Sequence, residues 1–434
     1  MQLNDRGAGE SLRAGLMAAT CALLAPVARA QAPSDDPTQI DTGLLYYQED
    51  GGRVRSIGAI VKLNRDLGDE RVLGAQIAVD SLTGGSPNGA VAQKSVQTFA
   101  TPSGSSLTQA PPRRGDDDDH EQLYTIAAGR QPLDTSFHDL RVAGDLSWTQ
   151  PVGIGNKLSV GAHLSKEYDF ISASANGMFS HDFNNRNTTL GVGASAEFDQ
   201  VKAVGGTPLP GTSYALFRKQ DGAENKRVYG AQLGLTQVMA RNWITQLNLS
   251  VDRSTGYLND PYKILSQVNA GGVTTDYWFE NRPDTHTRRS AYLGNKLALG
   301  RSVLDVAYRY GTDDWGIDSH TVTAKYRLRV GGSAYIEPQL RWYRQGAADF
   351  YSLFLTSAPT GFMSADPRLA AFTAKTVGLK LGLPLAGWGE VGLRLEGYQQ
   401  DPKVRSSSLA GLSGLDLNPR LRAVVLQLDW RFGF

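Results

Sequence analysis

The sequence has little cysteine and few long apolar runs. Its 434 residues include one cysteine, Cys21, so a disulfide-stapled secreted fold is excluded. Beyond the N-terminal region, no apolar run approaches the ~20 residues of a membrane-spanning helix, which excludes a helical membrane protein. Charged residues make up 20% and apolar residues 41% of the chain, so the composition also excludes intrinsic disorder. The 48 glycines and the many aromatic residues favour an all-β fold.

Residues 1–30 are typical of a secretory signal peptide. Arg6 and Arg13 precede an apolar run, and Ala28-Arg29-Ala30 forms a small-residue cleavage site. An uncleaved membrane anchor is the alternative. Cleavage would leave a single cysteine-free domain over residues 31–434, without thiol chemistry or cysteine-bound metal. This domain would carry equal numbers of basic and acidic residues, which argues against a general nucleic-acid binder.

Past residue 30, apolar and polar residues alternate in segments of about ten, separated by turns or loops. The clearest segment is 420–434, in which every second residue from Val424 to Phe434 is apolar or aromatic. Gln427, Asp429 and Arg431 occupy the other face, because successive side chains of a strand point to opposite sides. A soluble β-sandwich also alternates in this way, so strand length must decide between the two folds.

The segments run to about ten to fourteen residues, longer than the usual sandwich strand and long enough to cross a bilayer at a tilt. Aromatic residues such as Trp148, Trp243 and Trp430 gather at the ends of the apolar faces, as in the girdles of membrane proteins. We therefore predict an antiparallel up-and-down transmembrane β-barrel in the outer membrane of a Gram-negative bacterium. Lipid and, through the terminal aromatic Phe434, the barrel assembly machinery would be its partners.

Sixteen strands are predicted, an even number as in most bacterial barrels. They cover residues 42–49, 53–65, 71–81, 136–150, 157–168, 170–183, 188–199, 226–239, 243–254, 286–299, 303–311, 319–330, 333–345, 372–383, 389–399 and 420–434. The connections between strands alternate between two sets. One set is short, as expected for periplasmic turns, and the other includes the long connections expected of extracellular loops. The long loops are 82–135, 200–225, 255–285, 346–371 and 400–419.

The polar face of these strands would line the lumen. Its charges would be the basic residues Lys62, Arg309, Lys325, Arg327, Arg329, Arg341, Lys380, Arg394 and Arg431 and the acidic residues Asp305, Glu337, Glu396 and Asp429. A basic excess would favour anions in the lumen. The alternative is structural pairing across strands, of Glu337 with Arg341 and of Glu396 with Arg394 and Arg431. Sixteen strands leave room for a water channel, unless residues 82–135 fold inward as a plug.

The sharpest local cluster of acidic residues is Asp116, Asp117, Asp118, Asp119 and His120. Clustered carboxylates suit hard cations such as Ca²⁺, although the spacing matches no metal loop. A solvated acidic loop is the alternative interpretation. We predict no resident cofactor.

Two groups of residues resemble catalytic sites of barrel enzymes. His163, Ser165 and Asn176 resemble the residues of outer-membrane phospholipases, but that site must face lipid and these side chains should face the lumen. An omptin-like protease needs Asp and His at the outer rim, where the candidates are His286, Asp313, Asp314 and His320. Neither pattern is sufficient to predict an enzyme.

Several segments resemble an uncharacterised proteobacterial family of predicted outer-membrane β-barrel proteins. They include residues 44–52 (LLYYQEDGG), 82–90 (LTGGSPNGA), 132–137 (PLDTSF) and 166–169 (KEYD), and the resemblance is densest over 44–206. Members look like proteins that accompany a flavin-attaching transferase, a thioredoxin-like protein and a small lipoprotein. The resemblance therefore implies a role near envelope redox chemistry and assigns no catalytic residue.

Three functions remain open. The first is a pore or transport channel with a basic-lined lumen. The second is a structural or binding barrel that houses or docks a small lipoprotein or a flavinylated redox partner. The third is a hydrolase at the outer rim.

Overall fold

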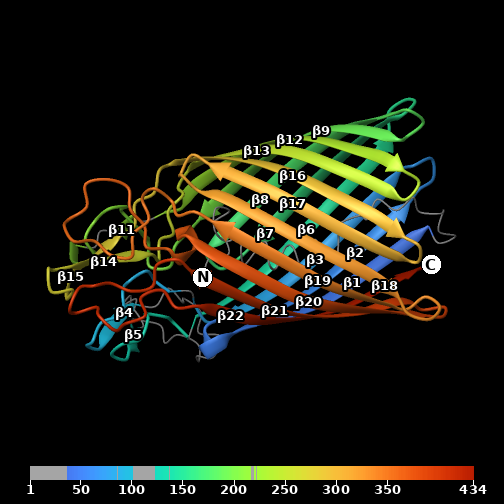
Figure 1. Cartoon of the computed structure of the whole chain (residues 1–434). Helices are drawn as coiled ribbons and strands as arrows, with labels where there is room; N and C mark the ends of the chain where they lie inside the picture. Colours follow the sequence, from blue (N-terminus) through green and yellow to red (C-terminus); the bar gives the residue numbers. More distant parts are fainter. Residues whose placement is uncertain (1–36, 86, 101–122, 136, 217–218, 221) are drawn as a thin grey trace, which may run out of the picture.

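The computed structural model describes residues 37–85, 87–100, 123–135, 137–216, 219–220 and 222–434. Sixteen strands close into one antiparallel barrel, in which each barrel strand pairs with the next along the chain and β1 pairs with β22 (Figure 1). These strands are β1 (Thr38–Glu49), β2 (Arg55–Asp66), β3 (Val72–Thr83), β6 (His138–Pro151), β7 (Asn156–Lys166), β8 (Phe170–Phe183), β9 (Thr188–Val201), β12 (Glu224–Ala240), β13 (Trp243–Gly256), β16 (Thr285–Leu299), β17 (Ser302–Asp313), β18 (Asp318–Arg329), β19 (Tyr335–Gln345), β20 (Phe372–Leu385), β21 (Gly389–Pro402) and β22 (Leu421–Gly433).

The predicted fold class and the number of barrel strands are confirmed. The largest difference in a strand boundary is at β1, which begins at Thr38 rather than at residue 42. Its first residues, Thr-Gln-Ile-Asp, show little apolar alternation. They are nevertheless extended because their backbone pairs with β2 on one side and β22 on the other.

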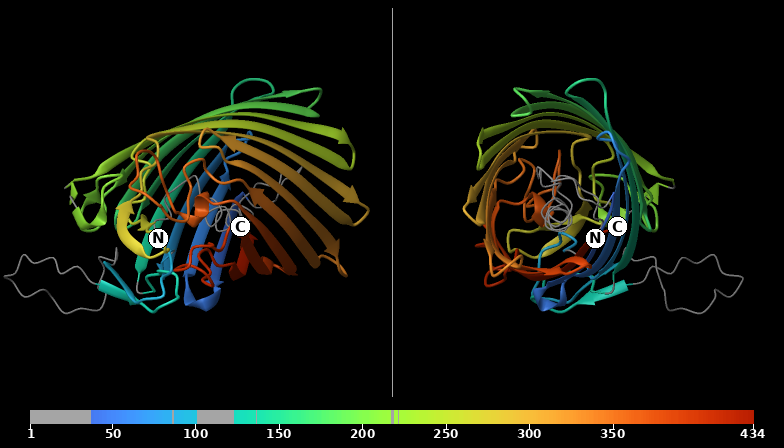
Figure 2. Two further views of the ribbon diagram at one scale, coloured as in Figure 1. Left: turned by 60° about the vertical axis from the view of Figure 1, so that its left-hand side comes forward. Right: turned by 90° about the vertical axis from the view of Figure 1, so that its right-hand side faces the viewer.

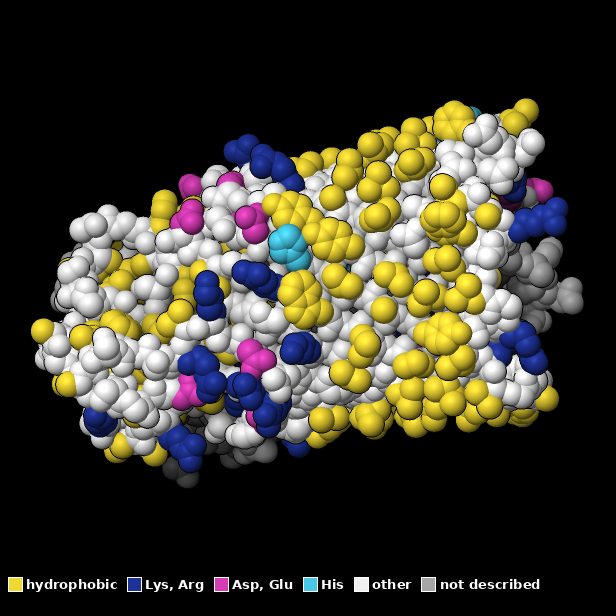
Figure 3. All heavy atoms as spheres, viewed as in Figure 1, with side chains coloured by type: hydrophobic (Ala, Val, Ile, Leu, Met, Phe, Trp, Pro, Cys, Tyr) yellow, Lys and Arg dark blue, Asp and Glu magenta, His cyan; other side chains and the backbone are white. Residues whose placement is uncertain are grey.

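The outer surface of the barrel is apolar. Ile77, Leu146, Leu164 and Val377 are each exposed by 62–65%, and yellow side chains cover the cylindrical surface in Figure 3. In a sandwich these side chains would pack against a second sheet and be buried. The period-two alternation therefore places the apolar face outside and the polar face inside a closed ring.

The two ends of the barrel differ. At one end the strands are joined by short turns, such as the β8–β9 turn, where Asn184, Asn185 and Arg186 all have positive φ angles of 50–66°. Asn tolerates this left-handed conformation better than most residues, which suits it to so tight a turn. The predicted short turns thus fall at this end, which we call the turn end.

The opposite end, the loop end, carries the long connections, and these contain structure that the sequence analysis did not predict. Three small hairpins lie there: β4 (Gln97–Ala100) with β5 (Leu123–Ile126), β10 (Thr207–Pro208) with β11 (Lys219–Gln220), and β14 (Ile264–Val268) with β15 (Thr274–Phe279). Three 3₁₀ turns, η1 (Asp50–Gly52), η2 (Tyr214–Leu216) and η3 (Pro367–Leu369), complete the elements. Within the described residues, no helix has the length and hydropathy to cross a bilayer. The predicted signal peptide lies outside the described residues.

Candidate functional site: the charged lumen and its loop cap

The inward face of β17 to β22 carries most of the predicted lumen charges. On β18, Val322 and Leu328 are exposed on the outside, so Lys325, Arg327 and Arg329 lie on the inner face. The same alternation places the other predicted charges inside, namely Asp305 and Arg309 on β17, Glu337 and Arg341 on β19, Lys380 on β20, Arg394 and Glu396 on β21, Asp429 and Arg431 on β22, and Lys62 on β2.

Several of these charges form ion pairs. Arg327 contacts Glu337 at 2.7 Å, and Arg394 lies 3.7 Å from Glu337 and 3.2 Å from Glu396. The predicted pair of Glu396 with Arg394 is therefore present. Lys380 pairs with Asp429 at 2.9 Å.

Two predicted pairs do not form. Arg341 lies four residues beyond Glu337 on the same strand, a separation of about 13 Å, whereas Arg327 comes from the neighbouring strand. The β21–β22 register places Glu396 opposite Val425, six residues from Arg431. Arg431 pairs instead with Asp41 of β1 at 2.5 Å.

A set of inward-facing cations remains without an ion pair among the described residues. It consists of Lys62, Arg309, Lys325, Arg329 and Arg341. Arg309 lies over the ring of Tyr292, with 5.4 Å between its guanidinium carbon and the ring centroid. Four of these cations lie on β17 to β19, so this side of the lumen keeps a positive excess after pairing, whereas Lys62 lies across the ring on β2.

The opposite wall carries inward carboxylates that the sequence analysis did not single out. The ring order places β6 to β9 across the lumen from β18 to β21. Asp145 on β6, Asp182 on β8, and Glu197 and Asp199 on β9 share the inner face of their strands. Strand alternation could have identified them, because these strands were predicted. The expectation of a basic-lined lumen therefore applies to one wall only.

The phospholipase-like residues do not form a site together. His163 Nδ1 lies 2.7 Å from Asp145 Oδ1, and Asp145 also accepts a hydrogen bond from Gln76 at 2.8 Å. The register places Ser165 opposite Ser172, and Asn176 opposite Gly161. No hydrogen bond joins His163, Ser165 and Asn176 within the described part of the chain.

Of the four rim residues, His286 and Asp313 contact each other, whereas Asp314 and His320 have other partners. His286 contacts Asp313 at 2.9 Å and stacks on Trp315 with 3.9 Å between ring centroids, so its side chain is buried. Asp314 accepts the backbone N–H of Thr287. His320 lies on the outer face of β18, where its Nδ1 is 2.8 Å from the hydroxyl of Tyr308. This geometry does not assemble an omptin-like site.

The long connections pack together into a cap at the loop end. One apolar cluster joins Ala90 and Phe99 of the β3–β6 connection to Ile264 and Phe279 of the β13–β16 connection. Another joins Val91 and Val268 to Leu412 of the β21–β22 connection. Viewed along the barrel, the β19–β20 connection, in orange, lies within the outline of the ring (Figure 2). The cap therefore narrows the outer mouth.

A buried cluster of charges joins two connections of the cap, β13–β16 and β19–β20. Its six members, three basic and three acidic, are Asp260, Lys263, Glu280, Arg282, Asp366 and Arg368. Arg282 contacts both Glu280 and Asp366 at 2.8 Å, and Arg368 contacts Asp366 at 2.5 Å and Asp260 at 2.8 Å. We call this group the cap charge cluster. Its formal charges balance, which compensates for the loss of hydration.

The two central carboxylates of this cluster are shifted in opposite directions. Burial and repulsion by Asp260 and Asp366 raise the pKa of Glu280. Burial opposes ionisation of Asp366 too, but Arg368, Lys263 and Arg282 hold the pKa of that carboxyl well below its usual range. Asp366 is therefore the anion on which the neighbouring cations depend.

The LTGGSPNGA segment enters the centre of the cap. The Pro87 carbonyl accepts a hydrogen bond from Lys263 Nζ at 2.6 Å, and the Asn88 carbonyl accepts one from the backbone of Ile264. Gly89 has a φ of +96°, and a Cβ there would lie 2.2 Å from the carbonyl oxygen of Ile264. The glycine is thus required both for its backbone conformation and for close packing. Part of the predicted plug, 82–135, is therefore a component of the cap.

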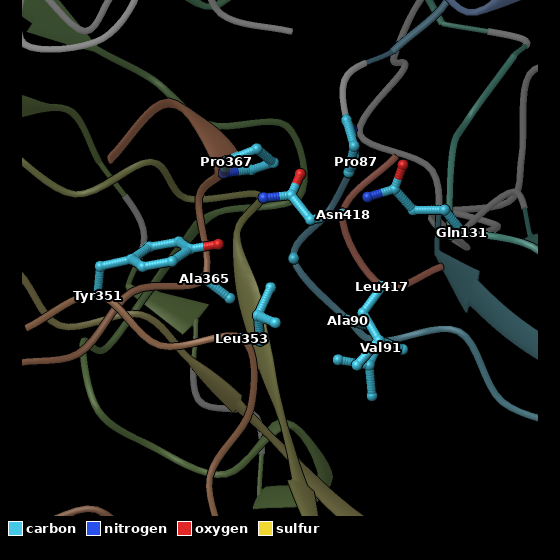
Figure 4. Close-up of a pocket in the computed structure, with 11 residues that line it drawn as sticks. Pro87, Ala90, Val91, Gln131, Tyr351, Leu353, Ala365, Pro367, Leu417 and Asn418 are labelled. Atoms are coloured by element: carbon cyan, nitrogen blue, oxygen red, sulfur yellow. The ribbon is translucent and has the colours of Figure 1, made fainter. Parts of the chain in front are cut away.

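A small pocket within the cap adjoins this segment (Figure 4). Pro87, Tyr351, Ala365 and Asn418 are among the residues that line it, and the space open to the centre of a water molecule is about 10 Å³. That volume holds about one water. The pocket is therefore too small for a substrate.

The acidic candidates Asp116 to His120 lie outside the described residues. Within the described part, no cluster of three or more His, Cys, Asp or Glu side chains could hold a metal.

These features define a closed sixteen-stranded β-barrel with an apolar exterior, a charged interior and a structured cap. The chain belongs to the family described as "Protein of unknown function (DUF3570)", whose model matches residues 13–432. A comparison with curated proteins finds no match.

Three solved bacterial structures have a similar outline, and one of them, OpdK, is an outer-membrane protein. CdiB from Acinetobacter baumannii is 8% identical with a TM-score of 0.45, over 91% of this chain and 60% of that one. The siderophore receptor PirA from Pseudomonas aeruginosa is 11% identical with a TM-score of 0.40, over 92% and 62%. OpdK from the same species is 10% identical with a TM-score of 0.38, over 92% and 98%. The chain thus spans about 60% of the length of the first two.

Proposed function

We propose that the protein is an outer-membrane channel of a Gram-negative bacterium that conducts small charged solutes. The observation that carries this proposal is the closed ring of sixteen strands with apolar side chains outside and ionised side chains inside. Barrels of this strand number are wide enough to enclose water. An ionised inner wall is costly to bury in apolar surroundings and is stable when hydrated.

The two walls suggest the class of solute. Free cations on β17 to β19 face carboxylates on β6 to β9. Asp199 pairs with Lys226 at 3.4 Å and Asp182 lies 4.0 Å from Arg186, which weakens the electric field across the lumen without removing it. Such a field favours solutes with separated charges, and the unpaired cations add a preference for anions. The cap would set access from the loop end.

Conductance across planar lipid bilayers tests this function. Purified protein should produce steady single-channel steps with a reversal potential that indicates more permeant anions than cations. Folded, inserted protein that gives no steps would contradict the channel.

The second candidate is a barrel that docks a small lipoprotein or a flavin-bearing redox partner. The inner face of β2, β3 and β6 carries the apolar side chains of Ile60, Ala78 and Ala143, but these pack on one another and are already buried within the chain. This candidate therefore rests on the family resemblance alone. Stoichiometric co-purification of a partner, together with absent conductance, would favour this candidate. We propose no catalytic role.

A further inference from the structure

A row of basic side chains follows the outer face of the barrel, at the loop end of the apolar band. Dark blue side chains gather there in Figure 3. The row consists of Arg227 (β12), Arg253 (β13), Arg289 (β16), Arg344 (β19), Lys375 (β20) and Arg422 (β22), and we call it the outer belt. Each member is exposed and shares its strand face with outward apolar residues, such as Trp342 beside Arg344 and Val377 beside Lys375.

The strand register groups the belt into two sets of three. Arg227 and Arg253 are diagonal neighbours, because Arg253 pairs with Tyr229, and Arg289 is likewise diagonal to Arg253. Diagonal neighbours are about 7–8 Å apart. In the second set, Arg344 is diagonal to Lys375.

Arg422 completes the second set. Gln399 of β21 lies between Lys375 and Arg422 and pairs with both. Two strand spacings amount to about 10 Å. Each set therefore presents three cations over about 15–18 Å of the barrel surface.

None of the six side chains of the belt forms an ion pair with a described residue. Three carboxylates lie near the belt. Asp50 accepts the backbone N–H of Arg422 at 3.3 Å, and the other two have further partners. Asp318 accepts a hydrogen bond from the Tyr310 hydroxyl at 3.0 Å, whereas Asp401 binds Arg420 and also accepts from Gln399 at 2.8 Å. The belt thus carries more positive charge than the carboxylates beside it.

On the strands, outward basic side chains are concentrated at the loop end, whereas at the turn end the turns carry Arg71, Arg186, Arg241 and Arg301. Among the described strand residues, Arg65 on β2 is the basic residue that faces outward at the turn end. Between the two sets of the belt, the outward side chains of Tyr308, Tyr310 and His320 form an aromatic group of the kind found at membrane interfaces.

We propose that the outer belt binds the phosphate groups of lipid headgroups in the leaflet at the loop end. Guanidinium groups match phosphate in charge and in geometry. A lipid fits better than a soluble anion, because the belt adjoins the apolar band and acyl chains can lie below it while phosphates meet the cations. The proposal rests on insertion of the barrel into a bilayer and is independent of conduction.

The test compares two triple variants of the full chain. Arg344→Gln, Lys375→Gln and Arg422→Gln remove one set of the belt. Arg65→Gln, Arg241→Gln and Arg301→Gln remove the same charge from the turn end. Each purified protein is titrated in neutral detergent with diphosphoryl lipid A or with phosphatidylcholine, and bound lipid is counted by native mass spectrometry. Entry into phosphatidylcholine vesicles verifies that each variant is folded.

The unaltered protein and the turn-end variant should prefer lipid A. The belt variant should bind it roughly 10- to 100-fold more weakly, with unchanged binding of phosphatidylcholine. A belt variant that enters vesicles yet keeps the full preference would overturn the belt and leave the channel intact. Unaltered protein that fails to enter any vesicle would instead contradict the membrane barrel itself.

Discussion

Asp366 and Glu280 lie in the same buried cluster, but their carboxylates contribute differently to the cap. Asp366 accepts hydrogen bonds from both Arg282 and Arg368. Asp366→Asn removes the carboxylate that Arg282 and Arg368 share and leaves each with one carboxylate contact, to Glu280 and to Asp260. Because both guanidinium groups are buried, we expect the change to destabilise the cap by about 3–5 kcal/mol. The loops should then be cut faster by protease and the single-channel conductance should rise, while the barrel stays folded.

Glu280→Gln is the matched comparison. Its side-chain oxygen can still accept from the Ser364 hydroxyl or the Asp260 N–H, so the expected cost is smaller, about 1–2 kcal/mol. Asp416→Asn, in the exposed pair with Arg405, serves as a surface control. Equal protection of the loops in the Asp366 and Asp416 variants would show that the cap charge cluster does not hold the cap.

The same pair of residues predicts how the cap responds to pH. The raised pKa of Glu280 means that the folded cap binds this proton more tightly than unfolded loops do. Its contribution to stability is therefore complete below the ordinary value of 4.5 and is lost as pH rises through the raised value. The contribution of Asp366, whose pKa is lowered, persists well into the acid range. Loop protection measured by proteolysis should thus be greater near pH 5 than near pH 8, and Glu280→Gln should flatten that difference.

The strands β18 and β19 present different chemistry on their two faces, and this allows a controlled test of the basic wall. Lys325 and Arg341 face inward and have no ion pair among the described residues. Replacing both with Gln should lower the anion-to-cation permeability ratio by roughly two- to fivefold, because free positive charge is removed from the lumen. The reversal potential in a salt gradient measures this ratio.

Arg344→Gln with Lys375→Gln removes the same charge from the outer face and should leave the ratio unchanged. Arg327→Gln with Arg329→Gln should act in the same direction as the lumen variant. The variant that lacks Arg327 and Arg329 also breaks the ion pair between Arg327 and Glu337, so Arg394 is then the cation that remains in contact with Glu337. An unaltered reversal potential in both lumen variants would show that the basic wall does not select ions.

Turn chemistry and packing explain why the loops escaped prediction. The β14–β15 hairpin has five- and six-residue strands whose buried side chains pack on other loops, so no two-faced alternation marks them. Contacts such as Lys263 to Pro87 join residues 176 positions apart. No local pattern reports such contacts.

The barrel considered as one body has a large outward apolar surface. Side chains such as Ile77, Leu146 and Val377 are more than half exposed and lie in a continuous band. Monomeric soluble proteins rarely expose apolar patches larger than a few hundred Å². We expect the processed protein to aggregate without detergent and to float with phosphatidylcholine vesicles in a density gradient. A folded monomer that stays in solution without detergent would refute the membrane assignment.

The alternation of side chains along each strand determined the barrel, its sixteen strands and the inner or outer face of each residue, because a period of two is a local property that survives in any closed sheet. Tertiary structure alone decided which inward charges pair, as with Arg327 and Glu337, because this depends on the register between strands. It also decided that acidic and basic walls face each other and that the loops close into a cap, since both follow from the order of strands around the ring and from contacts between distant segments.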